Sequence, residues 1–224
     1  PTSTDTVQTA PSKAEQLEQL YADYWEDLLK RNPVQATFVG DSRYNDQLPN
    51  FYSPEYRKES IAFAKNWLAK FEAIDASDVS GQTRLSYDIL VRDLKLNLEG
   101  SEFRTDLMPL DQFSNIIGLF AQLGSGTGAQ PFKTVQDYDN WLKRARKMPE
   151  LTTQMQTNMR EGMTAGMVQP KVLMVKVLPQ LDGILKEKVE DSIFWGPIKN
   201  LPASFSAADK KRLTDEFRQL IAKD

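Results

Sequence analysis

The sequence predicts an all-α protein, an irregular array of about six to eight helices with one long ordered loop near residues 101–132. Three observations indicate this class. Apolar side chains recur every three or four residues over most of the chain. Capping signals, in which an acidic residue follows a Ser or Thr at the third position, precede several of these segments. The hydrophobic content, 40% of 224 residues, is enough for one sizeable domain or two small helical ones.

The two ends of the chain differ in pattern. Residues 1–11 are mainly Thr, Ser, Pro and Gln, and are expected to form a flexible tether. The chain begins at Pro1 rather than Met, and we expect a processed, exported protein. Residues 12–224 are expected to form the helical N-terminal domain of a larger protein. The last predicted helix reaches Asp224 with no Gly, Asn or Pro to end it, which predicts a truncated C-terminal end.

Three helices are expected before residue 101. Ser12 and Glu15 form a capping box for the first, which Asn32-Pro33 ends. Ser53-Pro54 begins the second after an irregular loop rich in Asp, Asn and Gly. The third spans about residues 81–98, with Gly100 placed to end it. It carries the apolar residues Leu85, Ile89, Leu90 and Leu94.

The helical periodicity fails between Ser101 and Phe132. A loop of this length in a compact domain predicts either a function or a contact with another part of the molecule. Within it, Gly124, Gly126 and Gly128 resemble a phosphate-binding loop only in glycine content, because the Gly-Lys-Ser/Thr ending and a preceding strand are missing. A flexible loop is the default interpretation, and a mobile flap over a cleft is the functional alternative.

Further helices are expected towards the C-terminus. Thr134 with Asp137 caps one that Pro149 should kink or break. Methionines then recur at every fourth residue, a spacing that favours core packing over a peptide-binding surface. The next predicted helix contains Pro179, and Ser206 with Asp209 caps the last. The methionines of the stripe are Met155, Met159, Met163 and Met167.

Two charged clusters are interpreted as solvated surface rather than as sites. The basic one is expected on the helix face opposite Trp141, Leu142 and Ala145. The acidic one is expected at a wet helix end, because a catalytic carboxylate pair needs a cleft. The clusters are Lys143, Arg144, Arg146 and Lys147, and Glu187, Glu190 and Asp191.

Composition excludes several functions. The net charge of −3 lacks the positive field that attracts nucleic acid, so no nucleic-acid partner is expected. Histidine and cysteine are both absent, which removes the usual zinc ligands and the imidazole base of serine and cysteine hydrolases. The apolar runs are too short for a transmembrane segment. The chain by itself is therefore not expected to be a zinc- or histidine-dependent enzyme.

Several segments, in the same order along the chain, carry a resemblance to a known family. They are residues 24–29, 32–37, 40–49 (Gly-Asp-Ser-Arg-Tyr-Asn-Asp-Gln-Leu-Pro), 131–138 and 160–170. These segments resemble the N-terminal part of a bacterial family catalogued as domain of unknown function 885.

The resemblance implies a helical, metallopeptidase-like hydrolase in which a His-Glu-x-x-His helix of the C-terminal part holds zinc. It also implies an exported lipoprotein, periplasmic or tethered to the outer membrane, with a lipid anchor upstream of residue 1. The His-Glu-x-x-His motif does not occur in this sequence, so no catalytic, cofactor-binding or metal-binding residue is assigned to this chain. Zinc is expected only in the full-length parent.

Two functions follow as hypotheses. In the first, the chain is the non-catalytic N-terminal portion of a zinc-dependent peptidase and forms the substrate cleft with a missing C-terminal half. Its partners are then that half and a peptide substrate. Arg160, Glu161 and the glycines of 124–128 are the residues expected at the cleft or interface. The alternative is a stand-alone extracytoplasmic helical binding or scaffold protein without enzymatic activity. The first predicts an exposed apolar surface, and the second a closed polar one.

Overall fold

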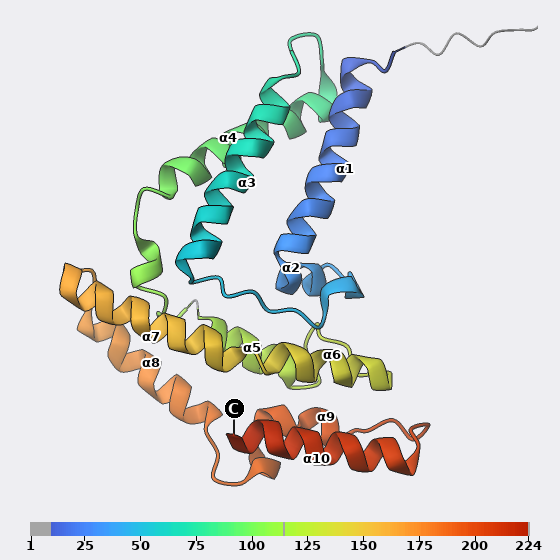
Figure 1. Cartoon of the computed structure of the whole chain (residues 1–224), viewed down its shortest axis with the longest axis vertical. Coiled ribbons are helices and arrows are strands. Elements are labelled where there is room, and N and C mark those ends of the chain that lie inside the picture. The colour runs from blue at the N-terminus through green and yellow to red at the C-terminus, as the bar shows by residue number, and fades with distance from the viewer. Residues whose placement is uncertain (1–9, 114, 224) are drawn as a thin grey trace, which may run out of the picture. The chain divides into compact units, whose positions relative to one another are not determined.

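The structure, a computed structural model, describes residues 10–113 and 115–223. These residues form helices α1 to α10 joined by loops and short 3₁₀ turns, and the described ranges contain no β-strand (Figure 1). The predicted all-α class is confirmed. Most of the predicted tether, residues 1–11, lies outside the described residues.

The chain divides into two compact units. The first unit combines the described part of residues 1–28 with residues 58–103, and the second unit combines residues 29–57 with 104–224. Each unit has its own cluster of buried apolar side chains. The second unit contains every residue that the sequence singles out as a possible site.

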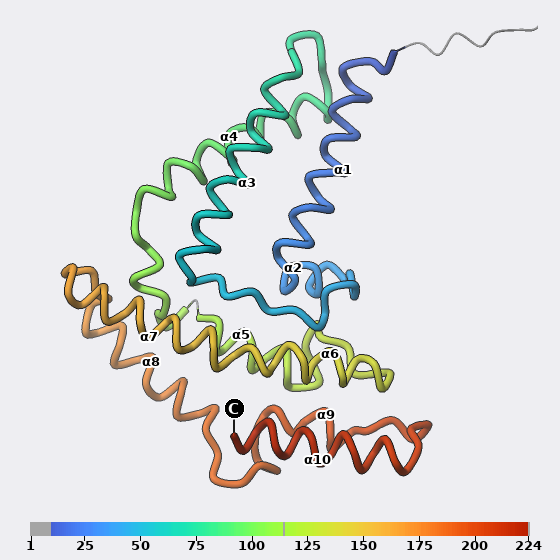
Figure 2. Tube along the Cα trace, in the orientation of Figure 1, coloured from blue at the N-terminus to red at the C-terminus, as the bar shows by residue number. Residues whose placement is uncertain are grey.

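The first unit is built from most of α1 (Lys13–Arg31), most of α3 (Pro54–Glu72) and α4 (Gly81–Gly100), which run in alternating directions (Figures 1 and 2). Trp67 and Phe71 of α3 pack with Leu17 and Leu94 in its core. Of the apolar residues that the sequence places on this helix, Leu94 is buried in the core, whereas Leu85 and Ile89 are about half exposed.

Predicted capping boxes begin two of the helices. In α1, Ser12 N donates to Glu15 Oε2 at 2.7 Å, and Glu15 N donates to Ser12 Oγ at 3.3 Å. In α6, Asp137 N donates to Thr134 Oγ1 at 3.2 Å, and Thr134 N donates to Asp137 Oδ2 at 2.8 Å. Each cap satisfies amide groups that a helix start leaves without partners.

The second unit contains the remaining helices. They are α2 (Pro33–Phe38), α5 (Ile116–Gly124), α6 (Val135–Ala145), α7 (Met148–Ala165), α8 (Lys171–Ile184), α9 (Gly196–Lys199) and α10 (Ala207–Lys223). Their core centres on aromatic rings: Trp141 lies 4.6 Å from Phe120, and Tyr138 lies 5.8 Å from Phe217, measured between ring centroids. Helix α10 packs against α6, which places the last helix on this core.

The region predicted as a long loop, 101–132, is not irregular throughout. It contains a 3₁₀ turn, Thr105–Leu107, and helix α5. Asn115 caps α5 through its Oδ1, which accepts from Gly118 N at 2.6 Å. The apolar run in α5 is too short to show a helical period, so the sequence does not reveal it.

The prolines and methionines of α7 behave partly as predicted. Helix α6 ends at Ala145, and α7 begins at Met148 with Pro149 in its first turn, so the predicted break is confirmed. Met155 is buried, as core packing predicts. Met163 is 67% exposed, so the methionine stripe is core only over the first part of the helix.

Candidate functional site

Arg144 corrects the prediction that the basic cluster forms a solvated face. Its side chain is fully buried. Arg144 lies three residues after Trp141 on α6, so both side chains lie on the inner side of the helix. Burial is possible because the guanidinium finds oxygen acceptors there, whereas Lys143, Arg146 and Lys147 remain exposed as predicted.

The guanidinium of Arg144 donates five hydrogen bonds to oxygen atoms of other segments. The acceptors are Pro33 O at 3.2 Å, Tyr44 O at 2.7 Å, Gln47 O at 2.9 Å, Thr37 Oγ1 at 2.9 Å and Gln130 Oε1 at 2.8 Å. None of these is a carboxylate. Burial lowers the pKa of Arg144 to about 10, so the group stays charged at neutral pH. Arg144 thus holds the segment 33–47 against α6, a structural role.

Close packing accounts for the glycines of 124–128. A Cβ on Gly124 would lie 2.2 Å from Trp141 Cζ2 and 2.6 Å from Phe194 Cδ1. A Cβ on Gly128 would lie 2.5 Å from Gln122 O, and Gly126 adopts a φ of +86° beside Pro197. These contacts require glycine without any bound ligand.

Arg160 and Glu161 lie in the last turns of α7. Glu161 Oε1 accepts from Arg104 Nη1 at 3.0 Å, and Arg104 also pairs with Asp106 at 2.9 Å. Arg160 is exposed. Arg160 and Glu161 therefore lie near the turn 105–107, whereas the glycines pack against Trp141, Phe194 and Pro197, so the predicted residues do not form one site.

The acidic cluster Glu187, Glu190 and Asp191 also forms no catalytic pair. Glu190 pairs with Arg218 of α10, and both side chains are about half exposed. Hydrogen bonds from the backbone and from Arg218 lower the pKa of Glu190. The prediction of a solvated helix end agrees with this exposed ion pair.

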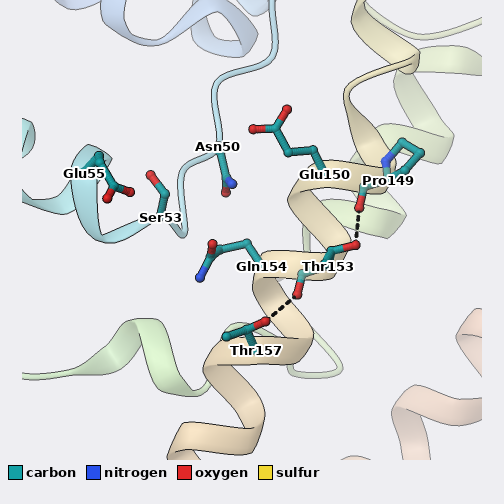
Figure 3. Close-up of a pocket in the computed structure, with 8 residues that line it drawn as sticks. All are labelled: Asn50, Ser53, Glu55, Pro149, Glu150, Thr153, Gln154 and Thr157. Atoms are coloured by element: carbon teal, nitrogen blue, oxygen red, sulfur yellow. Dashed lines mark hydrogen bonds between the residues drawn. The ribbon is translucent and has the colours of Figure 1, made fainter.

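A polar pocket of about 570 Å³ lies between residues 50–55 and the first half of α7 (Figure 3). Figure 3 shows Glu150 and Gln154 projecting from α7 towards Asn50. The hydroxyls of α7 are engaged within the helix: Thr153 Oγ1 donates to Pro149 O at 2.7 Å, and Thr157 Oγ1 donates to Thr153 O at 3.1 Å. The pocket lining comprises Asn50, Ser53, Glu55, Pro149, Glu150, Thr153, Gln154 and Thr157.

This pocket is acidic. It contains the carboxylates of Glu55 and Glu150 and no lysine or arginine, so its charge suits a cationic or donor-rich polar ligand rather than an anion. Asn50 Oδ1 is buried there without a hydrogen-bond partner. Sequence reasoning missed the pocket because its two sides come from segments about a hundred residues apart, and neither segment carries a recognisable motif.

Helix α8 exposes apolar side chains. Val177 is fully buried, yet Val172, Val175 and Leu178 are each more than half exposed. Single exposed apolar residues are normal, but three on one helix form a patch of the kind found at interfaces.

Comparison with known families shows where the chain belongs. The model of a family described as "Bacterial protein of unknown function (DUF885)" matches residues 33–224, and the chain belongs to this family. The family resemblance inferred from the sequence is thereby confirmed; the zinc-binding peptidase part remains a prediction.

The fold is similar to a crystal structure described as "the putative lipoprotein from Colwellia psychrerythraea", with a TM-score of 0.77 and 16% sequence identity. The match covers 96% of this chain but only 39% of that chain. At this identity the likeness shows the fold alone. The comparison with curated proteins gives no match. Among the described residues, no helix is both long and apolar enough to cross a membrane.

Proposed function

We propose that this chain is the non-catalytic N-terminal helical portion of a longer zinc-dependent peptidase and helps to form its substrate cleft with a C-terminal part. The supporting observation is one of length: the fold of almost the whole chain recurs in a protein of which it covers only 39%. The exposed apolar side chains of α8 are what the same hypothesis predicts for a portion that packs against further protein.

The residues of this chain do not fit a zinc site. Histidine and cysteine are absent from the sequence. Within the residues that the structure describes, no group of three or more acidic side chains is placed to hold a metal ion. In the proposed parent, zinc and its chemistry therefore belong to residues outside this chain, and this portion contributes surface and support.

The proposal includes export and a lipid anchor upstream of residue 1, which would tether the parent in the periplasm or at the outer membrane. It is supported by the similar structure, which is described as a "putative lipoprotein", and by the family resemblance.

The test compares the product of the complete gene with the 224-residue chain. We expect the longer protein to bind zinc and cleave members of a mixed peptide library, and the chain to do neither. A complete gene product without zinc and without peptide cleavage would contradict the proposal.

The polar pocket favours a second candidate function, a stand-alone binding protein without enzymatic activity. Its carboxylates, Glu55 and Glu150, suit a cationic ligand. Calorimetric titration with a lysine-rich peptide tests this candidate, with the double variant Glu55→Gln/Glu150→Gln as the control. Equal heats for both proteins would rule out this pocket as the site.

A further inference from the structure

Helix α8 has apolar side chains on two opposite sides. Successive residues of an α-helix turn by about 100°, so Val172, Val175 and Leu178, spaced three apart, follow one side of the helix. Val177 follows Val175 by two residues and therefore projects from the opposite side. A helix that is apolar on both sides is normally covered on both sides.

The inner side of α8 is already covered by the second unit. Val177 is fully buried in the core, and Met174 and Leu181 pack against the same core. Helix α8 contacts α5, and Gln180 Nε2 donates to Gln112 O at 3.0 Å. These contacts hold the helix in place without using its outer side.

The outer side of α8, defined here as Val172, Val175 and Leu178, is 65%, 56% and 60% exposed at these residues. More than half of each side chain is therefore in contact with water, and covering these apolar surfaces would favour an interface.

We propose that the outer side of α8 is the docking surface for the remaining part of the longer parent protein. The proposal rests on the proposed function, because it takes the parent to be longer than this chain. The occupant follows from length: all but the matched 39% of the similar structure lies outside this fold, so a parent of that length has a large further part that could cover α8. An apolar helical or loop surface of that part would fit Val172, Val175 and Leu178, and the exposed Lys171 and Asp182 of the same side add two charged contacts.

The absence of cysteine makes a direct test simple. A V175C variant is prepared in this chain and in the complete gene product, with any other cysteine of the latter replaced by serine. We expect a maleimide reagent to label V175C at least about tenfold more slowly in the complete product, because a docked surface must open first. The matched control is K211C on α10, whose native side chain is 81% exposed, and which should label at the same rate in both proteins.

A second variant checks the result through stability. The pair Val172→Lys/Leu178→Lys should leave the Tm of this chain unchanged and should lower that of the complete product, because only there would charges be buried. An unchanged Tm in both proteins would overturn the proposal.

The outcomes separate the two proposals. Equal labelling of V175C in both proteins overturns the docking surface, even where the complete product binds zinc and cleaves peptides. Slow labelling in a complete product that has neither activity supports docking and contradicts the peptidase function. A rate of V175C labelling in this chain that instead falls as the protein concentration rises would mean that a second copy of the chain covers α8. That result would overturn the proposal.

Discussion

Helices α6 and α8 belong to the same unit and both bury one side, but their outer sides differ. On α6 the inner residues Trp141 and Arg144 are fully buried, and Lys143 points outwards, 58% exposed. On α8 the inner Val177 is equally buried, yet Val175 and Leu178 face solvent. The outer side of α6 is thus charged, whereas that of α8 leaves aliphatic side chains in water.

Each helix also breaks the simple rule of apolar inside and polar outside. On α6 the exception is the buried Arg144, and five acceptors within the chain compensate for its burial. On α8 the exceptions are the aliphatic side chains of Val172, Val175 and Leu178, which the described residues leave more than half exposed. Acceptors within the chain thus stabilise the buried Arg144, whereas the exposed side chains of α8 are those that we propose a partner covers.

The largest effect is expected at Arg144. Replacing Arg144 by alanine should lower the free energy of unfolding by about 3–5 kcal/mol, because buried acceptors lose their donor and a cavity remains. Denaturant unfolding of the purified chain measures it. Arg146→Ala, two residues along on the exposed side, is the control and should cost less than about 1 kcal/mol. Similar losses in both variants would contradict the role assigned to Arg144.

The next effect concerns the packing around Trp141. Gly124→Ala would place a Cβ 2.2 Å from the Trp141 ring, and the forced shift should cost about 3 kcal/mol. The control is Gly183→Ala in α8, where no atom lies within 4 Å of the added Cβ. That change should stabilise the chain by up to about 1 kcal/mol, because alanine favours a helix over glycine. Thermal unfolding of both variants is the measurement.

A smaller effect distinguishes the two sides of α8. Val177→Ala should cost about 1–2 kcal/mol, since it leaves a cavity in the core. Val175→Ala removes the same atoms from the exposed side and should change stability by less than about 0.5 kcal/mol. Equal costs in denaturant unfolding would mean that the outer side is already covered in this chain.

A last effect, which appears only at high pH, is expected at Tyr138, which donates to Pro197 O at 3.0 Å. Burial raises the pKa of Tyr138 to about 12, above its ordinary value of about 10. The neutral phenol is favoured in the folded chain, so its stabilising contribution is constant below about pH 10 and is lost as the pH rises towards 12. Tyr138→Phe should therefore weaken the decline in stability between pH 10 and 12.

Helix starts could be predicted from the sequence because the determining residues are local. Ser12 with Glu15, and Thr134 with Asp137, cap the helices that they predicted. Helix α5 and the burial of Arg144 could not be predicted in this way. The first is a short apolar run, and the second depends on acceptors that the fold brings from residues 33–47 and 130.

The candidate surfaces were predictable only in part. The expectation of an exposed apolar surface agrees with α8, but the sequence predicted only a helix there, because helical periodicity alone does not show which side stays exposed. The glycines of 124–128 attracted a functional interpretation, although contacts with Trp141 and Pro197 account for them. The polar pocket depends on residues 50–55 meeting α7, which no local pattern indicates.

The most direct test of the account is an experimental structure of the complete gene product. We predict that Val172, Val175 and Leu178 are buried there against residues that do not belong to this chain. If those three side chains face solvent in the complete protein, α8 is not the docking surface, and the proposed packing of the rest of the protein on this helix is wrong.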